Sequence, residues 1–471
     1  MSLATLTVSA LREKLAAKEV SPCDAVQAVV EAIREKDAAL GGYLPLDEAQ
    51  LAAALQAADA ADVSLPLGGV PIAIKDAIAV QGAPCSCASR ILQGYISPYD
   101  ATAITRLRAA GAIPLGRANM DEFAMGSATE NSSVQKTRNP RDSERTPGGS
   151  SGGSACVVAA DTAFAALGSD TGGSIRQPAS FTGIVGLKPS YGRISRYGLV
   201  AFASSLEGIG PMTKSVRDSA LLLQAMAGHD PLDSTSLNAP VPDYLAGLEN
   251  GVKGLRIGLP KEYFIEGIAP GVRASVEAAA RKLEAAGAEL VEISLPHTEY
   301  AVAVYYIIAT AEASSNLARF DGIRYGHRAA APQDLADLYS RTREEGFGPE
   351  VKRRIILGTY VLSSGYYDAF YVKAQKVRAL IQQDFREAFG KVDLIASPVT
   401  PTTAWKLGQF SDDPLQTYLA DIFTIAANLA GICGISVPCG QSDGLPVGFQ
   451  LMGPSLGEAI LLRAARAVEV V

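Results

Sequence analysis

The segment Gly168–Pro178, GSDTGGSIRQP, follows an apolar run, AFAALGSD, that is typical of a buried strand. The residues after it, SIRQPASFTGIVGL, can start a helix. Gly172 and Gly173 allow a tight turn between the two, because glycine reaches backbone angles that are closed to other residues. The pattern predicts a strand–turn–helix junction with Ser174 at the turn, where free backbone N–H groups gather and can stabilise an oxyanion.

A second glycine-rich stretch, TPGGSSGGSACVVAA, begins at Thr146. It lacks the lysine of a phosphate-binding P-loop, which argues against a nucleotide site. Gly148–Gly152 matches the G-x-S-x-G pattern of a hydrolase nucleophile elbow, but the polar segment NPRDSERTP stands where an elbow needs a buried strand. The three histidines, His229, His297 and His327, lie in no suggestive motif, so a serine–histidine pair is disfavoured.

A serine nucleophile without a histidine needs another base, and a buried lysine can serve because burial favours its neutral amine. Lys75 ends the apolar strand GVPIAIK on its small-residue face, where another group can approach. Taken alone, Lys75 is better interpreted as a strand-end partner of Asp76, and Ser174 is equally compatible with a serine that caps a glycine turn. The residues by themselves leave these structural alternatives open.

The composition excludes several classes of protein. With 48% hydrophobic and 19% charged residues, the chain is expected to be globular. A net charge of −7 without a basic cluster argues against a main nucleic-acid-binding surface. Cys85 and Cys87 have no second pair and no histidine at ligand spacing, so we expect no metal site. The six cysteines and a charged N-terminus predict a cytoplasmic protein without a signal peptide.

Periodic patterns predict several elements. Residues 21–36 are expected to form a helix capped by Ser21, and Asp100 is expected to cap the helix that Gly111 ends. A helix over 270–286 lies between two apolar strands, and this order predicts parallel pairing. The uncharged segment 422–440 is interpreted as a buried helix and strand, not a membrane span, because glycine and proline interrupt it.

The stretch GGSSGGSACVVAADTAFAALGSDTGGSIRQPASFTGIVGLKPSYGR resembles the core of the amidase signature family. The resemblance implies a Ser–cis-Ser–Lys triad: Ser174 as nucleophile, Ser150 as the bridging serine after a cis peptide bond, and Lys75 as base. It also implies an oxyanion hole made by the backbone N–H groups of Thr171, Gly172, Gly173 and Ser174. Ser151 and Arg176 match family positions that brace the triad.

For the fold, the resemblance implies a single large α/β domain over residues 1–471, built on a mixed, mostly parallel β-sheet with helices on both faces. We expect a helical segment over 1–60 and a catalytic core over 61–240. A βαβ unit and a helical substrate-pocket region would follow over 241–390, and residues 391–471 would return to the sheet.

Outside the core, stretches such as MDEFAMGSATENS and SSGYYDAFYVKAQKVR are similar to one branch of the family, the A subunits of bacterial amidotransferases that act on mischarged tRNA. This similarity implies that the chain hydrolyses glutamine and supplies ammonia to partners. A free amino acid needs an acid for its ammonium group and an arginine for its carboxylate. The substrate residues implied are Gly126, Ser127, Tyr305, Arg354 and Asp421.

The implied partners are a B subunit, which would bind the mischarged tRNA and use ATP and Mg²⁺, and a small C subunit that straps the other two together as a heterotrimer. No cofactor is expected in this chain. Ala426, Cys433 and Cys85 depart from the usual pattern of the branch. Two alternatives stay open: a free-standing hydrolase of small or aryl amides, and a non-catalytic scaffold protein of the complex.

Overall fold

The computed structural model describes residues 2–264, 266–411 and 413–470. Within them the strands are β1 (Pro71–Lys75), β2 (Ile113–Ala118), β3 (Ala165–Asp170), β4 (Val185–Lys188), β5 (Gly208–Thr213), β6 (Arg256–Pro260), β7 (Glu289–Ile293), β8 (Leu394–Pro398), β9 (Cys433–Ser442) and β10 (Leu445–Gly453). The helices are α1 (Val8–Ala16), α2 (Pro22–Leu40), α3 (Glu48–Asp59), α4 (Thr102–Ala109), α5 (Gly152–Ala159), α6 (Arg176–Thr182), α7 (Val216–Met226), α8 (Pro270–Ala285), α9 (Ala301–Asn316), α10 (Leu335–Gly346), α11 (Pro349–Leu362), α12 (Lys373–Phe389), α13 (Pro414–Leu419), α14 (Ile425–Ala430) and α15 (Glu458–Val470).

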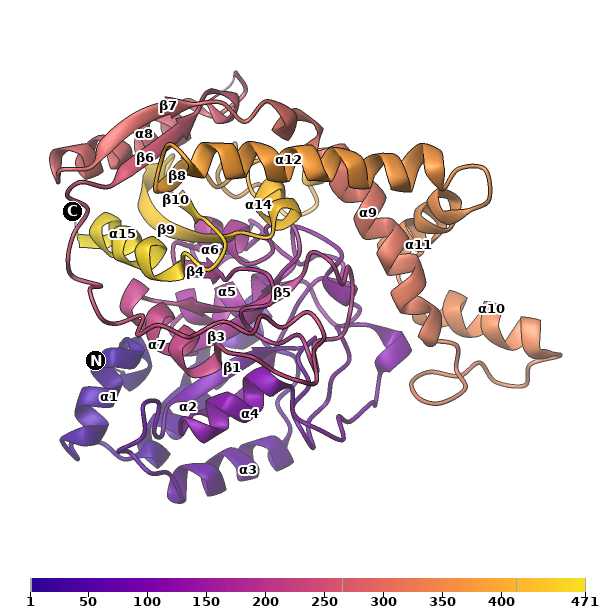
Figure 1. Ribbon diagram of the computed structural model, residues 1–471. Helices are drawn as coiled ribbons and strands as arrows, with labels where there is room; N and C mark the ends of the chain where they lie inside the picture. Colours follow the sequence, from indigo (N-terminus) through magenta and orange to yellow (C-terminus); the bar gives the residue numbers. More distant parts are fainter. Residues whose placement is uncertain (1, 265, 412, 471) are drawn as a thin grey trace.

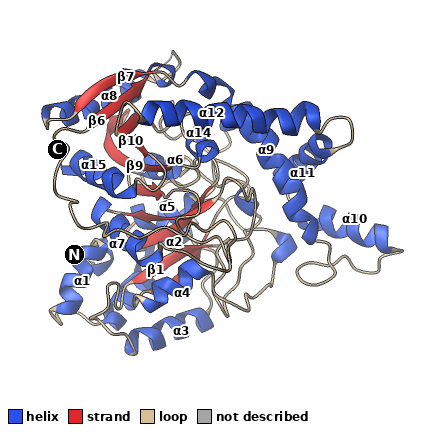
Figure 2. Ribbon diagram, in the orientation of Figure 1, coloured by secondary structure: helices blue, strands red, loops and turns tan. Residues whose placement is uncertain are grey.

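All these strands join one mixed sheet, in the order β2-β1-β3-β5-β4-β9-β10-β8-β6-β7 (Figures 1 and 2). The strands at its two ends pair in parallel, β1 with β2 and β3, and β6 with β7 and β8. The five pairings between β3 and β8 are antiparallel, so among the described strands parallel pairs do not predominate. The expected mixed sheet is therefore confirmed, but its centre corrects the expectation of mostly parallel strands.

Chain connections account for part of the antiparallel centre. Parallel neighbours need a crossover connection, whereas antiparallel neighbours can be joined by a tight turn. Asp443 and Gly444 join β9 to β10 directly, and both have positive φ, 53° and 77°, as a two-residue hairpin turn requires. A connection without a regular helix, residues 189–207, links β4 to β5.

Several predicted elements are confirmed. Ser21 caps α2 and forms a capping box with Asp24, and β6, α8 and β7 form the predicted parallel unit. Residues 422–440 contribute α14 and part of β9, both packed in the core. The prediction for Asp100 is wrong: α4 begins after Ala101, and the Asp100 carboxylate instead accepts the N–H of Gln81 at 2.7 Å.

Helices cover both faces of the sheet (Figure 1). Successive residues of a strand point to opposite faces, and in β3 Leu167 joins the larger apolar core while Ala166 joins a smaller one with Ile175 and Met212. Helices α5 and α6 pack over the smaller core, next to the glycine turn; α7 packs on β5. Ser174 is thereby held between β3 and α6.

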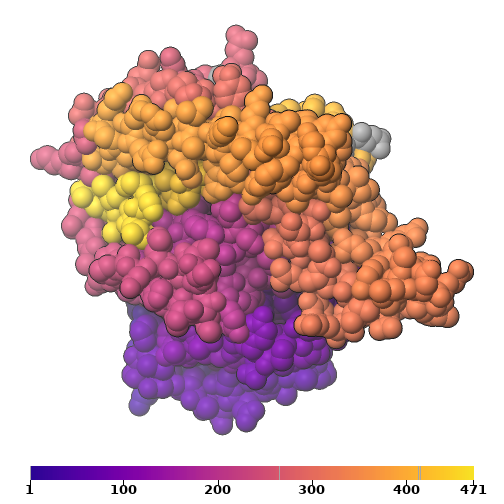
Figure 3. All heavy atoms as spheres, turned by 45° about the vertical axis from the view of Figure 1, so that its right-hand side comes forward, coloured from indigo at the N-terminus to yellow at the C-terminus, as the bar shows by residue number. Residues whose placement is uncertain are grey.

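Helices α9 to α11 and one end of α12 form an arm that stands out from the sheet (Figures 1 and 3). Helix α9 packs along α11, and its N-terminal part lies near the core. The arm brings Tyr305 and Arg354 toward the sheet from a distant part of the sequence. No helix in the described ranges is both long and apolar enough to span a membrane.

Candidate active site

Lys75 reaches two serines from the end of β1. Its Nζ donates to Ser150 Oγ and to Ser151 Oγ, each at 2.8 Å, and lies 3.4 Å from the carbonyl oxygen of Ser169. The Gly149–Ser150 peptide bond is cis, as the resemblance implied. Ser151 is held by β3, because its Oγ donates to the Ser169 carbonyl at 3.0 Å and accepts the Ser169 N–H at 3.2 Å. Ser151 thus links Lys75 to β3, while its bracing role stays a prediction.

The surroundings of Lys75 favour its neutral form. The side chain is completely buried, and burial lowers the pKa of Lys75 to about 7, although the carboxylates of Asp121 and Asp170 act in the opposite direction. Asp76 is not the partner of Lys75: its carboxylate lies 3.1 Å from Arg117 Nε. The strand-end ion pair considered from the sequence is therefore excluded, and Lys75 is left as a base near neutral pH.

Ser174 lies at the predicted strand-to-helix turn and is 9% exposed. Its main-chain carbonyl accepts the N–H of Ser151 at 3.2 Å, which brings the two serine segments together. Its Oγ has no hydrogen-bond partner among the described residues, so Ser150 Oγ and Ser174 Oγ form no hydrogen bond in the structure.

The glycine turn corrects one part of the predicted oxyanion hole. The N–H of Gly173 donates to Asp170 Oδ1 at 2.9 Å and is therefore already engaged. The N–H groups of Thr171, Gly172 and Ser174 have no acceptor within the described part of the chain. Three of the four predicted donors thus remain available for an oxyanion, and Gly173 serves to shape the turn, at φ 143°.

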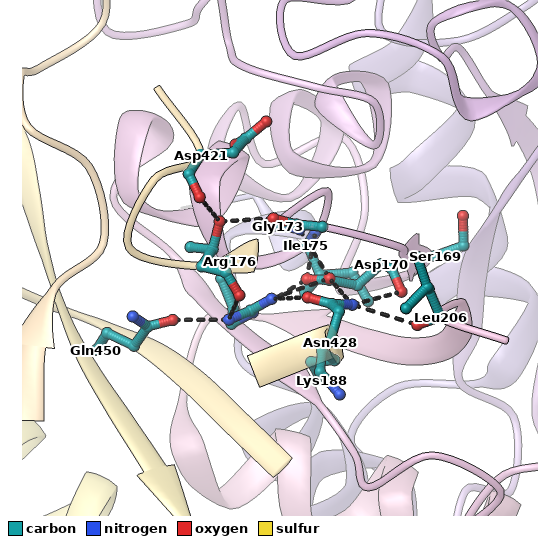
Figure 4. Close-up of polar contacts among 12 residues, drawn as sticks. Ser169, Asp170, Gly173, Ile175, Arg176, Lys188, Leu206, Asp421, Asn428 and Gln450 are labelled. Atoms are coloured by element: carbon teal, nitrogen blue, oxygen red, sulfur yellow. Dashed lines mark hydrogen bonds and ion pairs between the residues drawn. The ribbon is translucent and has the colours of Figure 1, made fainter. Parts of the chain in front are cut away.

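Arg176 braces this turn from below (Figure 4). The fully buried guanidinium contacts both carboxylate oxygens of Asp170 at 3.1 Å, and also Gln450 Oε1 at 2.7 Å and Asn428 Oδ1 at 2.6 Å. Burial alone raises the pKa of Asp170, but Arg176 outweighs it and holds that pKa at about 2. Asp170 stays ionised and can accept the N–H of Gly173 and, at 3.1 Å, that of Ile175.

Ser127 and Asp421 meet beside the glycine turn. Ser127 Oγ donates to Asp421 Oδ2 at 2.6 Å, whereas Asp421 Oδ1 is buried without a partner in the described residues. A Cβ added to Gly173 would lie 3.0 Å from that Oδ1, so the orphan oxygen faces the turn that carries Ser174. Burial raises the pKa of Asp421 to about 7. An unpartnered buried carboxylate suits a cationic ligand group.

The helical arm supplies Tyr305 and Arg354. The Tyr305 ring packs on Gly172, where an added Cβ would lie 2.8 Å from Cζ. Arg354 is 3% exposed and lies 5.3 to 5.7 Å from the ring centres of Phe202, Tyr306 and Tyr418. Its Nε donates to Glu350 Oε1 at 2.8 Å, and its terminal nitrogens have no partner among the described residues. Arg354 therefore presents two nitrogens for a ligand.

A cavity of about 200 Å³ adjoins these groups. It is lined by Gly126, Ser127, Glu350, Arg354 and Tyr418, together with Trp405 and neighbouring residues. Ser174 and Asp421 do not line it, but Ser127, which does, is hydrogen-bonded to Asp421 beside the turn that carries Ser174. The predicted substrate residues are thus brought together beside the triad.

The geometry agrees with comparisons against known proteins. Residues 24–462 match the family model described as amidase. The chain belongs to the amidase family. The protein of Methylacidiphilum infernorum that is named as the A subunit of glutamyl-tRNA(Gln) amidotransferase is 60% identical, over 98% of this chain and 93% of its own length. A protein of the same name from Geobacter sp. is 57% identical, over 100% of this chain and 98% of its own.

Solved structures of amidases share the fold. The crystal structure of the A subunit of glutamyl-tRNA(Gln) amidotransferase from Thermotoga maritima has a TM-score of 0.84 and 45% identity, covering 99% of this chain and 94% of that one. The peptide amidase of Stenotrophomonas maltophilia has a TM-score of 0.81 and 30% identity, covering 98% and 96%. The fold thus serves both an amidotransferase and a peptide amidase, so the substrate must be argued from the pocket.

Several polar residues of this amidase site were missed by sequence reasoning. Asn428 and Gln450 bind Arg176, Glu350 orients Arg354, and the fully buried Asp121 lies near Lys75. None belongs to a spacing motif. In the sequence, these residues stand out only as polar side chains within otherwise apolar or glycine-rich stretches. This indicates that each residue is unusual, but it does not indicate which residue it contacts.

The structure also shows where the residues lie that a histidine base or a metal site would use. His297 pairs with Asp384 at 2.8 Å and His327 with Glu345 at 2.7 Å, while His229 is exposed; in the described part of the chain no histidine contacts a serine of the site. Cys85 and Cys87 are buried free thiols, as expected. Within the described ranges no group of three or more histidine, cysteine or acidic side chains is arranged to hold a metal ion.

Proposed function

We propose that the chain is the glutaminase subunit of a tRNA-dependent amidotransferase. One observation carries this proposal: the unpartnered oxygen of Asp421 faces the turn that carries Ser174, and Arg354, with its unpaired terminal nitrogens, lines the adjoining cavity beside Ser127. A small or aryl amide needs neither charge, whereas the α-ammonium and α-carboxylate of glutamine need both. The relatives named as A subunits of glutamyl-tRNA(Gln) amidotransferase support a place in such a complex.

In the proposed reaction Lys75 takes a proton from Ser150, and Ser150 takes one from Ser174 as Ser174 Oγ attacks the side-chain carboxamide carbon of glutamine. The electron pair of the carbonyl moves to its oxygen, where the free N–H groups of Thr171, Gly172 and Ser174 stabilise the negative charge. The depressed pKa of Lys75 keeps much of its amine neutral near neutral pH, so that it can accept the first proton.

The relay then runs in reverse. The proton on Lys75 returns through Ser150 to the departing nitrogen, the C–N bond breaks, and ammonia leaves an acyl-enzyme on Ser174. Water, activated by the same lysine through Ser150, attacks the ester and releases glutamate. The fixed contacts of Lys75 with Ser150 and Ser151 keep the base in place through both halves of the cycle.

The partners in this proposal carry out the amidation. A B subunit binds Glu-tRNA(Gln) or Asp-tRNA(Asn), activates the mischarged acid with ATP and Mg²⁺, and receives the ammonia. A small C subunit straps the other two together. The net charge of −7 suits a chain that leaves the main RNA contacts to its partner. Six free cysteines support a place in the cytoplasm.

The arm offers a surface for the B subunit. Tyr360, Tyr366, Tyr367 and Phe370 are 36% to 47% exposed and lie at the junction of α11 and α12. Exposed tyrosine and phenylalanine side chains are typical of protein interfaces. Because α11 also carries Arg354, a partner docked here would lie beside the pocket that releases ammonia.

The Ser174→Ala variant tests the division of labour. In the complex with B and C subunits, we expect this variant to lose glutamine-dependent amidation of tRNA but to keep amidation driven by added ammonium chloride. Lys214→Ala is a control that removes a lysine remote from the triad. Hydrolysis of small neutral amides without any glutamine hydrolysis would instead identify a free-standing amidase.

A further inference from the structure

Two adjacent acidic residues, Asp121 and Glu122, follow β2 and are almost completely buried, at 0% and 2% exposure. The proton relay uses neither. Buried carboxylates are costly unless they accept hydrogen bonds, so each needs a structural explanation. Each one contacts a different part of the site.

Asp121 joins the bridging-serine segment to the loop that carries Ser127. Its carboxylate accepts the N–H groups of Ala128, Thr129 and Asn131, at 3.3, 2.8 and 3.2 Å. Its own N–H donates to the carbonyl oxygen of Ser150 at 3.2 Å. Loop 126–131 therefore takes its shape from a residue that is also bonded to Ser150.

Two glycines enclose the same carboxylate. A Cβ added to Gly149 would lie 2.1 Å from Asp121 Oδ2, and one added to Gly126 would lie 2.4 Å from its Cγ. Both distances are too short for any side chain. The close packing of Gly126 and Gly149 around Asp121 sets the distance between the Ser150 segment and Ser127, which holds Asp421.

Glu122 reaches the opposite side of the pocket. Its Oε2 accepts the N–H of Gly348 at 2.9 Å, and Ser89 Oγ donates to its Oε1. Gly348 is the N-cap of α11 and supplies no side-chain cap, so the carboxylate of Glu122 satisfies this end of the helix. Helix α11 carries Arg354 within its first two turns.

The backbone between these contacts is held in an unusual conformation. Phe123 and Ala124, which are not glycines, have positive φ values of 49° and 61°. Such conformations persist only where the surroundings impose them, and they cluster at functional sites. The segment is therefore kept in one shape by the contacts on both of its sides.

We propose that Asp121 and Glu122 are positioning residues that couple the serine–lysine relay to amino-acid recognition. Asp121 aligns Ser150 with Ser127 and Asp421 at the α-amino end of the substrate, and Glu122 fixes the helix that presents Arg354 at the α-carboxyl end. The assignment of the two ends rests on the proposed glutaminase function. The coupling itself rests on the contacts of the two acids.

The test of Glu122 compares two amides in the assembled complex. Glu122→Gln should raise KM for glutamine about tenfold to a hundredfold with little change in kcat, because Arg354 loses its alignment. It should leave KM unchanged for 4-aminobutanamide, which is glutamine without its carboxylate. Ser89→Ala, which removes one bond to Glu122, should show a weaker form of the same split. Glu344→Gln, an exposed acid four residues before Gly348, is the matched control.

Asp121 is tested through the pH dependence of Ser174 acylation by a fluorophosphonate probe, which needs no amide substrate. The groups that act on Lys75 are Asp121, Asp170, Cys87 and Glu207. Of these, Asp121→Asn removes one negative charge that favours the ammonium form of Lys75. The acylation midpoint should therefore move about one pH unit lower, and the maximal rate should fall because loop 126–131 loses its acceptor. A purely structural role would lower the rate without moving the midpoint.

These outcomes separate the coupling from the proposed function. If the wild-type complex releases no ammonia from glutamine, the glutaminase proposal fails, while the acylation midpoint and the deuterium exchange of α11 amides still test Asp121 and Glu122. Faster exchange at the start of α11 in Glu122→Gln supports the coupling. Equal KM changes for both amides, unchanged α11 exchange, or an unmoved midpoint in Asp121→Asn would overturn it.

Discussion

Lys75 Nζ lies 2.8 Å from Ser150 Oγ, although the two residues are 75 positions apart in the chain. The contact joins the end of β1 to the segment before α5, inside a fully buried environment. Because no histidine of the described residues reaches these serines, Lys75 is the base that the site offers. The protonation of Lys75 should therefore govern both the activity and the pH dependence of stability.

The pH dependence of glutamine hydrolysis should follow Lys75. With a pKa of about 7, its neutral fraction rises through neutral pH, so kcat/KM should rise with pH and level off above about 8. Lys75→Arg stays protonated over this range and should lose at least about a hundredfold in kcat/KM. The rate of ammonia release between pH 5.5 and 9 measures both the pH profile of the wild type and the loss of activity in Lys75→Arg. Substantial activity of Lys75→Ala at neutral pH would exclude Lys75 as the base.

Burial of Lys75 should also lower the free energy of unfolding. The pKa of Lys75 is about 7 in the folded chain, against 10.5 for an exposed lysine, so between these values the unfolded chain binds the extra proton. Stability should rise with pH across this window, and the full cost should be present below pH 7. Lys75→Met should therefore raise the free energy of unfolding more at pH 6 than at pH 10, by about 1.4 kcal/mol per unit of pKa depression. Urea unfolding at the two pH values checks this; equal effects would contradict it.

Asp421 should control the binding of the α-ammonium group. Its pKa of about 7 means that the free site is partly protonated near neutral pH, so KM for glutamine should increase as the pH falls below 7. Asp421→Asn should raise KM about tenfold or more and remove that pH dependence. Initial rates at pH 6 and 8 give the KM values for glutamine that test this prediction. A KM that rises at low pH in the variant as well would assign the effect to another group.

Arg176 should contribute mainly to stability. Arg176→Met leaves Asp170 buried without its cation, and breaking a buried ion pair costs about 3–5 kcal/mol. In the wild type the pKa of Asp170 is about 2, so its stabilising contribution is complete above the ordinary value of 3.8 and is lost as the pH falls toward 2. In the variant, burial should raise this pKa above 3.8, so the contribution of Asp170 should change sign and stability should rise as the pH falls through the raised pKa. Urea unfolding from pH 3 to 7 measures the difference, and matching profiles would show that Arg176 does not set that pKa.

Gly172 should not tolerate a side chain. A Cβ at this position would lie 2.8 Å from Cζ of the Tyr305 ring, so Gly172→Ala should displace either the ring or the turn and reduce kcat/KM by about tenfold or more. Gly208→Ala is the matched control on the neighbouring strand β5, because nothing lies within 4 Å of its added Cβ. Rates close to wild type in Gly172→Ala would mean that the Tyr305 contact is dispensable.

The local elements of this protein follow from short-range patterns in its amino-acid sequence. Ser21 caps α2, the run before Gly172 forms β3, and Lys75 ends an apolar strand, because hydrophobic period, caps and glycine turns act over a few neighbouring residues. The resemblance to the amidase signature family then indicated which two serines and which lysine form the predicted triad. Asp100 shows the limit even of local signals, since its carboxylate is bound elsewhere.

The pairing of the polar groups, in contrast, follows from the three-dimensional packing of the whole chain. Asp76 pairs with Arg117 and leaves Lys75 to the serines, Gly173 gives its N–H to Asp170, and Ser127 meets Asp421 across 294 residues of sequence. Local sequence patterns likewise do not predict the antiparallel centre of the sheet. The physical reason is that buried polar groups bond to whichever partners strand register and loop packing bring within about 3 Å, and register depends on the whole sheet.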